Sequence, residues 1–581
     1  MGKKHQKYGL LILLILFFSS FSYTKVLADS TVKAKFAQID MYLDGESVRC
    51  KTFNISGDYY CNLVDLAGFF SGTASQFNVT ISKSKKTINI TTGKDYTSSI
   101  QQDFIFYIYN KNYNAKPLSK KIYVNGKQSN IKGYTIDGND YVKLKDLSKA
   151  VPFDMEMSSN KKQIYLFSKL PKNSYRVITA NEIKSNPVTH TFSRWKNTLM
   201  NYLVYNDDKT ISVIEANWST EGTISIETYD EKFRLKSKKQ LEYELPIFGG
   251  FYSGEKYNYI VFGDTNTEEN DNKEVIRIVK YNKDFKRLDS VSVKGGESFT
   301  IVPFDAACGR MSENGNQLVL HTSRLRYKTI DGKNHQSQLT IVVDTSSMEV
   351  LNYLGEFQDN HVSHSFDQYV HFDGNTHVLI DHGDAYPRAV TLTKQRIDDY
   401  INDGSFTYDR VNLFDIPGSD GANCTGVSIG GFETSSENYI VAINSVDHSL
   451  VKEYTNFSMK GLEIDQRDIL ICTVSRNNTA DSKVKQIKLA KYVGTDKIAS
   501  VPKLVKISDD KFMVLWQEFD LTGKEGDLKY VFLDKNGKTT SKAKSVKNFM
   551  LSDCQPIVTD NNVIWYTNEK GCRIFYKIPL N

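Results

Sequence analysis

The sequence has few prolines and cysteines, no long basic block, and no second apolar run of membrane-spanning length. Its 581 residues include 11 prolines, 7 cysteines and 10 histidines. The cysteines are irregularly spaced without a C-x-x-C pair, so neither a zinc ribbon nor a dithiol redox motif is indicated. Because lysine and arginine are scattered rather than clustered, a nucleic-acid partner is not expected.

The first 28 residues have the layout of a secretory signal peptide. Three lysines occur among the first seven residues, an apolar run extends from Gly9 to Phe21, and Val26-Leu27-Ala28 offers a small-residue cleavage site. The alternative, an uncleaved membrane anchor, is disfavoured because the run is short and no charged stop-transfer flank follows it. Cleavage would remove four lysines and lower the formal net charge from +6 to about +2. We therefore expect a secreted, extracellular chain without a transmembrane span, which could be associated with the cell surface.

An oxidising compartment permits disulfides. Cys50 with Cys61, and Cys554 with Cys572, are close enough in sequence to pair across neighbouring strands, and an odd total leaves at least one cysteine free. We interpret the cysteines as mainly structural.

Two segments near the N-terminus repeat each other, residues 35–96 and residues 118–170. Gly57 matches Gly138, and Asp65-Leu66 matches Asp146-Leu147. Each segment is predicted to form strands joined by a Gly turn, then one helix and a closing hairpin. In the second segment Leu144, Leu147 and Ala150 recur at helical spacing, which predicts one packed helix face.

These segments resemble the copper-amine-oxidase-like N-terminal domain, or stalk domain, of secreted Gram-positive proteins. The resemblance lies in "YTIDGNDY" at 134–141, "LKDL" at 144–147, "GTASQFNV" at 72–79 and "TGKDY" at 92–96. Val64 and Lys145 depart from the usual arginine of that family, and the Trp-Asp of its closing hairpin is missing. The resemblance implies a spacer or presentation module. It does not imply copper amine oxidase activity, because the Asn-Tyr-Asp/Glu-Tyr cofactor motif is absent from the sequence.

From residue 174 to residue 581 the pattern changes to short alternating strands separated by polar turns. One strand type recurs at intervals of about 50 to 75 residues. We predict a mostly β fold: small α+β stalk repeats followed by a β-propeller of about seven blades, closed by an early strand near Ser174. Separate β-sandwiches are the alternative, but they would need linkers that the sequence lacks. The recurring strands lie near Tyr202, Tyr257, Gln317, Thr376, Asn438, Lys511 and Asn562.

Seven of the ten histidines lie between His321 and His382, and this region supplies the candidate site. The segments "HTSRLRY" (321–327), "HVSHSF" (361–366) and "DHGDAYPR" (381–388) are predicted to be loops on one face of two neighbouring blades, with "DHGDAYPR" in the fourth. Loops on a rigid scaffold often carry binding sites. The candidate ligand-binding residues are Arg310, His321, Arg324, His361, His364, Asp381, His382, Asp384, Tyr386 and Arg388.

Three chemistries fit these residues, and the sequence does not choose among them. A divalent metal is an uncommitted cofactor, with His321, His361, His364 and His382 as candidate ligands. The arginines fit carboxylate or sulfate groups. The acidic residues of the loop at 264–271 are hard oxygen ligands of the kind that calcium binds, although a solvated turn explains them better. A purely structural role is the competing interpretation, in which Asp381, His382 and Asp384 hold adjacent strand ends together.

The sequence favours a binding protein over an enzyme: a surface-presented propeller that recognises an extracellular glycan or protein. The alternative is an extracellular polysaccharide-active enzyme, a metal-assisted lyase or hydrolase, in which Arg388 neutralises a uronate and His382 or Tyr386 moves a proton. Spacer repeats at the N-terminus favour display of the propeller over turnover.

Overall fold

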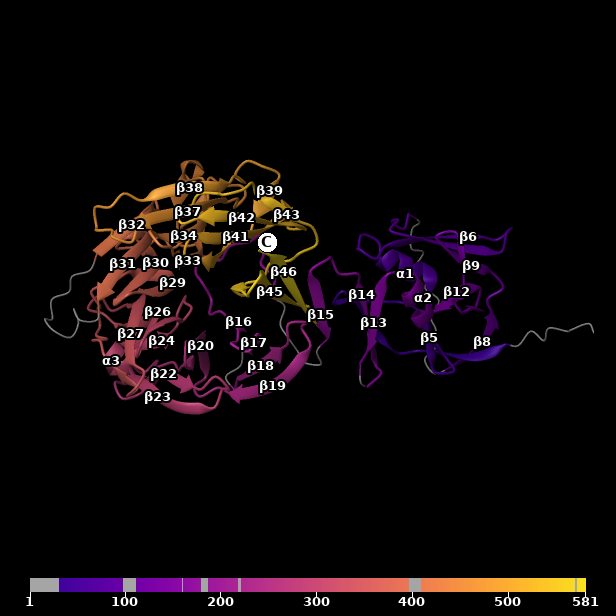
Figure 1. Cartoon of the computed structure of the whole chain (residues 1–581), viewed down its shortest axis with the longest axis horizontal. Coiled ribbons are helices and arrows are strands. Elements are labelled where there is room, and N and C mark those ends of the chain that lie inside the picture. The colour runs from indigo at the N-terminus through magenta and orange to yellow at the C-terminus, as the bar shows by residue number, and fades with distance from the viewer. Residues whose placement is uncertain are drawn as a thin grey trace, which may run out of the picture. The chain divides into compact units, whose positions relative to one another are not determined.

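The computed structural model describes residues 31–97, 111–158, 160–178, 186–217, 221–396, 409–569 and 572–580. The chain divides into two compact units, Met1–Lys169 and Leu170–Asn581, and both are mostly β, as the sequence predicts (Figure 1). The expected signal peptide at 1–28 lies outside the described residues. In the described part of the chain, every helix is too short or too polar to cross a membrane.

The first unit contains the same succession of elements twice, seven strands and one helix each time. The first copy consists of β1 (Val32–Phe36), β2 (Asp40–Leu43), β3 (Glu46–Val48), β4 (Thr52–Ile55), β5 (Asp58–Asn62), α1 (Leu63–Phe69), β6 (Phe77–Ser82) and β7 (Thr87–Thr92). The second consists of β8 (Asn112–Pro117), β9 (Lys121–Val124), β10 (Lys127–Ser129), β11 (Gly133–Ile136), β12 (Asn139–Lys143), α2 (Leu144–Ala150), β13 (Phe153–Met157) and β14 (Gln163–Ser168).

The two copies interleave in one core. Strands β1, β4 and β5 of the first copy and β8, β11 and β12 of the second close a six-stranded barrel. Strand β7 pairs in parallel with β9, and β14 pairs in parallel with β2, so each copy completes a sheet of the other. Leu144 and Leu147 are buried and Ala150 is half-buried, as the helical spacing predicts.

Local chemistry explains where these elements turn. Gly57 and Gly138 have φ values of +89° and +82°, which a side chain would disfavour, and each joins the two strands before a helix. Helix α1 begins after Asn62, whose side-chain oxygen accepts hydrogen bonds from the backbone of Val64 and Asp65.

The second unit is built from consecutive antiparallel strands. Its first part comprises β15 (Ser174–Ile178), β16 (Asn201–Tyr205), β17 (Ile211–Ala216), β18 (Thr223–Tyr229), β19 (Leu235–Glu242), β20 (Ile247–Ser253), β21 (Asn258–Gly263), β22 (Glu274–Tyr281), β23 (Arg287–Lys294), α3 (Gly295–Ser298), β24 (Thr300–Pro303), β25 (Arg310–Asn314), β26 (Gln317–Lys328), β27 (Asn334–Asp344) and β28 (Glu349–Val350).

The later part of this unit continues with β29 (Ser363–Asp373), β30 (Thr376–Ala385), β31 (Arg388–Arg396), β32 (Asp409–Asp415), β33 (Val427–Thr434), β34 (Asn438–Ser445), the 3₁₀ turn η1 (His448–Leu450), β35 (Glu453–Tyr454), β36 (Met459–Lys460), β37 (Asp468–Ser475), β38 (Lys485–Ala490), β39 (Lys497–Ala499), β40 (Lys503–Ser508), β41 (Lys511–Asp520), β42 (Glu525–Asp534), β43 (Lys544–Val546), β44 (Ile557–Val558), β45 (Asn562–Glu569) and β46 (Cys572–Pro579).

Half of these strands form four-stranded sheets. The orders are β16-β17-β18-β19, β20-β21-β22-β23, β33-β34-β37-β38 and β15-β46-β45-β44. Strands β39 to β43 form a five-stranded sheet, and β35 with β36 forms a separate hairpin. Strands β24 to β32 form a nine-stranded sheet, whose two parts are joined by the pairing of Ser337 with Ser363. Six of the seven recurring positions in the sequence begin or immediately precede the second strand of a sheet, whereas Tyr202 lies in the first strand, β16.

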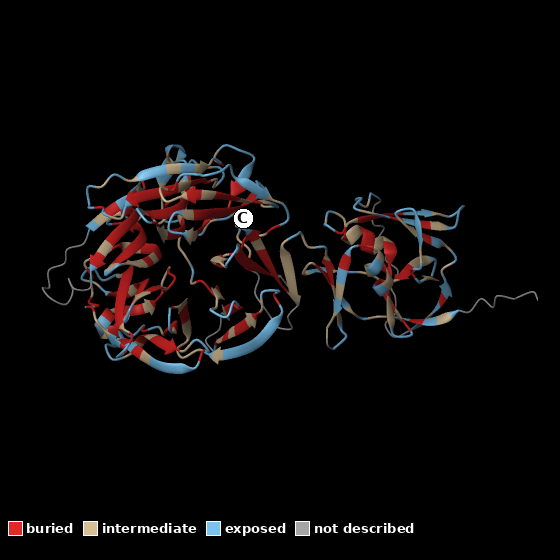
Figure 2. Ribbon diagram, viewed as in Figure 1, coloured by how far each residue is buried: buried red, intermediate tan, exposed pale blue. Residues whose placement is uncertain are grey.

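Apolar side chains concentrate in the middle strands of each sheet, and one edge strand is exposed. All six residues of β21 are buried, whereas β19 is exposed along nearly its whole length (Figure 2). The buried faces of successive sheets pack on each other, as in the cluster that Ile214, Ile226 and Phe262 share across two sheets. Packing of sheet on sheet therefore stabilises this unit.

The proposed cysteine pairs are wrong, because all seven cysteines are free thiols. Cys50 is half-buried and the other six are buried. The predicted loops also differ: residues 321–327 lie within the 12-residue strand β26, and residues 381–385 within the 10-residue strand β30. Only Tyr386 and Pro387 of "DHGDAYPR" form the turn between β30 and β31. These strands are longer than expected because their polar residues bond to one another in the interior.

Candidate functional site

The histidine-rich region forms a buried hydrogen-bond network between strands. His321 on β26 contacts the Thr340 hydroxyl through Nδ1 at 3.0 Å and the Asp381 carboxylate through Nε2 at 3.1 Å. Asp381 also accepts a 2.6 Å hydrogen bond from the Ser365 hydroxyl. Because His321, Ser365 and Asp381 are each 0% exposed, no ligand reaches them, and their bonds hold β26, β29 and β30 together.

The neighbouring acid and histidines have equally local partners. Asp384 accepts hydrogen bonds from His364 Nδ1 at 3.0 Å and from the Asn423 amide at 2.7 Å. His382 bonds through Nε2 to the Thr425 hydroxyl at 2.9 Å, and burial, reinforced by Arg467, lowers the pKa of its imidazole to about 4. Segment 361–366 thus faces 381–388, as predicted, but the contacts are structural.

The four histidines that the sequence offers as candidate metal ligands are not gathered into a metal site. Among the described residues, no group of three or more histidine, cysteine, aspartate or glutamate side chains is arranged to hold a metal ion. His321, His364 and His382 each bind a different partner. The His361 ring packs on Phe357, and burial with the nearby Arg326 lowers the pKa of this histidine to about 4.

The three arginines do not surround an open anion pocket. Arg324 donates to the backbone carbonyls of Gln338, Gly355 and Glu356, and burial lowers the pKa of its guanidinium to about 9. Arg388 likewise donates to four backbone carbonyls, those of Asp384, Pro417, Ala422 and Cys424. Both side chains therefore hold loops in place, which is a role that the planar guanidinium serves with carbonyls as well as with carboxylates.

The remaining two candidates have separate surroundings. Arg310 on β25 lies over the Tyr369 ring, with its guanidinium carbon 4.5 Å from the ring centroid. Tyr386 is 71% exposed at the turn between β30 and β31, outside any group of candidates.

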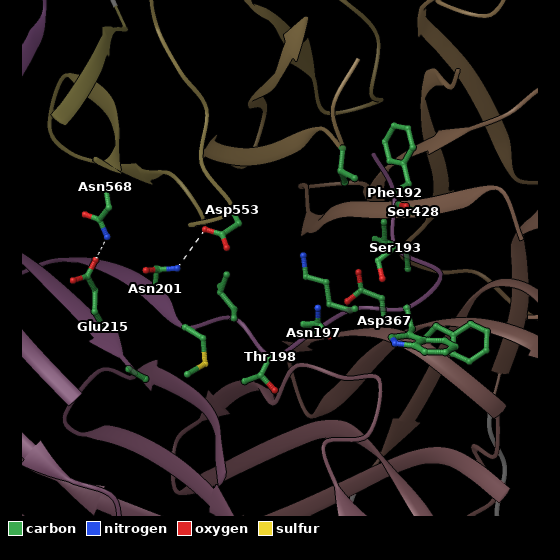
Figure 3. A pocket seen from close by; sticks show the side chains of 18 of the residues that line it. Phe192, Ser193, Asn197, Thr198, Asn201, Glu215, Asp367, Ser428, Asp553 and Asn568 are labelled. Atoms are coloured by element: carbon green, nitrogen blue, oxygen red, sulfur yellow. Dashed lines mark hydrogen bonds between the residues drawn. The ribbon is translucent and has the colours of Figure 1, made fainter. Parts of the chain in front are cut away.

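A different set of side chains meets in a cavity of about 560 Å³ in the second unit (Figure 3). We call residues Asn186 to Met200, which precede β16, the crossing segment. Eleven consecutive residues, 191–201, line the cavity, together with the ends of β17, β29 and β33. The crossing segment is fixed by backbone hydrogen bonds from Val188 to the Leu551 carbonyl at 2.9 Å and from Lys196 to the Phe366 carbonyl at 2.8 Å.

Asp367 enters the cavity because β29 contains a β-bulge. Ser365 pairs with Gly383 and Gln368 pairs with Asp381, so Phe366 and Asp367 together lie opposite the single residue His382. Such a bulge redirects a side chain, and in Figure 3 the Asp367 carboxyl group points into the cavity. Asp367 is 5% exposed, and burial raises the pKa of its carboxyl group although Lys196 and Arg310 act in the opposite direction.

Asp553 supplies a second carboxyl group from the connection between β43 and β44. The Asn201 amide donates to it at 3.3 Å (Figure 3). The Lys503 ammonium donates to the backbone carbonyl of Asp553. Burial raises the pKa of Asp553, opposed by Lys503 and Lys196. Burial and the nearby Lys196 together lower the pKa of Lys503 to about 7.

Glu215, also on the cavity wall, is neutralised. It forms an ion pair with Arg573 and accepts hydrogen bonds from Asn568 and Tyr566. The groups that remain available for chemistry are thus Asp367, Asp553 and Lys196. None of these was a sequence candidate, and of the predicted residues only His382 reaches the cavity wall. The predicted "HVSHSF" segment stops one residue before Asp367, and the bulge that aims this aspartate has no sequence motif.

Comparison with known proteins gives one kind of match. No family model matches the chain, and no curated protein matches its sequence. Among solved structures, a chimera of apocarotenoid oxygenase and RPE65 matches at 10% identity, with 62% of each chain covered and a TM-score of 0.28. A mutant of Synechocystis apocarotenoid oxygenase matches at 9% identity, with 68% of this chain and 67% of that chain covered and a TM-score of 0.30.

A cobalt-substituted form of the Synechocystis enzyme is similar to the same degree: 10% identity, 62% of this chain, 63% of that chain and a TM-score of 0.29. The chain thus spans under two thirds of the length of the first of these proteins. The matched structures are enzymes, which contradicts the prediction of a surface-presented binding protein that is not an enzyme, and we withdraw that prediction. TM-scores this low carry no oxygenase chemistry to this chain, whose function is argued below from its own cavity.

Proposed function

We propose that the cavity is the active site of an enzyme that transfers protons to and from a small polar substrate bearing a negative charge. The observation that carries this proposal is that two carboxyl groups and an ammonium group, those of the buried Asp367, the half-buried Asp553 and Lys196, line one cavity. They come from three distant parts of the chain. Placing two carboxyl groups and an ammonium group around one cavity is not needed to pack the surrounding strands.

The two carboxyl groups suit acid–base chemistry. Burial raises the pKa of both, and a carboxyl group that keeps its proton closer to neutral pH can act as a general acid. Asp553 lies beside a lysine whose pKa is lowered to about 7, so this pair can release and recover a proton near neutrality. We assign Asp367 as the general acid and Asp553 as the base.

The charge around the cavity favours an anionic substrate. Lys196 and Arg194 line the cavity. Lys503 and Arg310 lie outside its lining, and their positive charges act to lower the pKa of the Asp367 carboxyl group. Glu215 does not offset these cations, because Arg573 neutralises it. A substrate carboxylate or phosphate would therefore bind against Lys196, with its reacting end toward Asp367 and Asp553. The volume of about 560 Å³ suits a small molecule.

We also propose that the second unit is a seven-bladed β-propeller around this cavity. Dividing the nine-stranded sheet at the Ser337–Ser363 pair gives seven groups of four or five strands, which follow one another around a common centre in Figure 1. Strand β15 pairs with β46, so an early strand completes the last group, which supports a closed ring. Together with the proposed signal peptide and stalk repeats, this implies an extracellular enzyme.

The test is to incubate the purified chain with a panel of small organic carboxylates and phosphates and to follow their signals by NMR. We expect at least one to be consumed. In that reaction Lys196→Met should raise KM at least tenfold, since it removes the anchoring charge, whereas the exposed Lys236→Met should change nothing. Consumption of no panel member, or equal KM values for Lys196→Met and the wild type, would refute the proposal.

A further inference from the structure

A second cavity, of about 420 Å³, lies at the opposite ends of the strands that border the first. The first cavity is lined by residues 427–429 at the start of β33, and the second by Glu433 near its end. Strand β16 behaves in the same way, with Asn201 at the first cavity and residues 202–205 at the second. The two cavities are therefore distinct sites.

The second cavity combines aromatic walls with one carboxyl group. Tyr202, Tyr205, Phe251 and Tyr252 line it, and the remaining wall is mainly aliphatic. The Glu433 side chain is 20% exposed, and its nearest basic group is His371 Nε2 at 3.8 Å. In the part of the chain that the structure describes, no protein group donates a hydrogen bond to this carboxyl group, and Glu433 is among the residues that line the cavity.

The cations near Glu433 are occupied elsewhere. His371 donates from Nε2 to the Phe432 carbonyl at 2.9 Å, and burial, together with Lys506, lowers the pKa of its imidazole, so it is neutral at pH 7. Lys506, on β40, lines the cavity but forms a 2.7 Å ion pair with Asp509. A carboxyl group with no committed counter-ion is thus left beside aromatic rings.

We propose that this second cavity binds a small organic cation, a primary amine or a quaternary ammonium, between the aromatic rings and the Glu433 carboxylate. Aromatic faces attract ammonium groups through their quadrupoles, and a desolvated carboxylate supplies the opposite charge. The site stands independently of the proposed reaction in the first cavity.

Binding must be coupled to proton release. Burial raises the pKa of Glu433 to about 8, with Lys506 acting weakly against it, so the empty site is mostly protonated at pH 7. The other perturbed groups around it do not change charge between pH 7 and 9: His371 stays neutral, and burial raises the pKa of Tyr252 to about 12 and also raises the pKa values of Tyr202 and Tyr205. A cation requires the ionised carboxylate, so affinity should rise about tenfold from pH 7 to pH 9.

The experiment is isothermal titration of the full chain with tetramethylammonium chloride. We expect binding about tenfold tighter at pH 9 than at pH 7, with close to one proton released per cation at pH 7, measured in two buffers of different ionisation enthalpy. Glu433→Gln should abolish binding of the cation. Glu437 is an exposed acid in the turn between β33 and β34, and Glu437→Gln should leave binding intact.

A further variant keeps the test decisive if Glu433→Gln lowers the unfolding temperature. Lys506→Met removes a positive charge that lowers the pKa of Glu433, so the pH at which tetramethylammonium binding strengthens should move upward relative to the wild type. Absence of binding heat at millimolar cation, affinity independent of pH, or Glu433→Gln binding as well as the wild type would overturn the proposal.

Discussion

Arg573→Met should sharply destabilise the second unit, because it removes the counter-ion of the largely buried Glu215 and one of the cations that pair with the buried Glu227, which also lies 3.7 Å from Lys238. Arg573 on β46 is 1% exposed and forms ion pairs with Glu215 on β17 and with Glu227 on β18, the latter at 3.0 Å. The side chains of these acids are 11% and 3% exposed. This arginine thus joins the last sheet of the chain to the first sheet of the unit.

Removing one partner of a buried ion pair typically costs about 3–5 kcal/mol, since the remaining charge keeps its desolvation penalty without compensation. We expect Arg573→Met to lower the free energy of unfolding of the second unit by that amount in urea titrations. Adding Glu215→Gln and Glu227→Gln should recover part of the loss, because neutral amides cost less to bury. Arg234→Met, which breaks an exposed pair with Asp230, should leave the midpoint unchanged. A loss below about 1 kcal/mol for Arg573→Met would refute this reasoning.

Three further predictions concern titration, metals and thiols. The pKa of Lys503 is lowered to about 7 in the folded chain, so between pH 7 and about 10 the unfolded chain holds this proton more tightly. The free energy of unfolding should therefore rise with pH over that window. Urea titrations of Lys503→Met should lack that rise. Dialysis against EDTA should not change the unfolding temperature, because His321, His364 and His382 are bonded to protein groups; a drop would show a structural metal. Thiol titration of the unfolded chain without reductant should count seven thiols, and a count of five would reveal a disulfide.

Much of the fold was predictable because strand alternation is a local property. Runs such as Tyr259–Phe262 in β21 and Phe512–Trp516 in β41 stay apolar over four or five residues, which indicates a buried strand whatever its neighbours are. The repeated Gly turns and the Leu144–Leu147 spacing likewise depend on residues close in sequence. The position of a strand within its sheet was harder to predict. The strand at Tyr202 was grouped with six others that are second strands, yet it is the first strand of its sheet.

The site was not predictable in this way. Lys196, Asp367 and Asp553 are separated by more than 170 residues each, and only tertiary packing brings them to one cavity. The histidine-rich region was the candidate because seven of the ten histidines lie in it, but its side chains satisfy one another, as His321 and Asp381 do. The sequence shows that polar residues cluster in this region. It does not show whether their side chains contact each other or line a cavity.

The central claim is that Asp367 is the proton donor of an enzyme, and the most direct measurement is kcat for the consumed panel substrate in wild type and Asp367→Asn as a function of pH. General acid catalysis of this kind contributes about 10²–10⁴-fold. We predict that Asp367→Asn lowers kcat at least 100-fold and removes the fall in rate that the wild type shows as this carboxyl group loses its proton. A variant with unchanged kcat and the same pH profile would contradict the account.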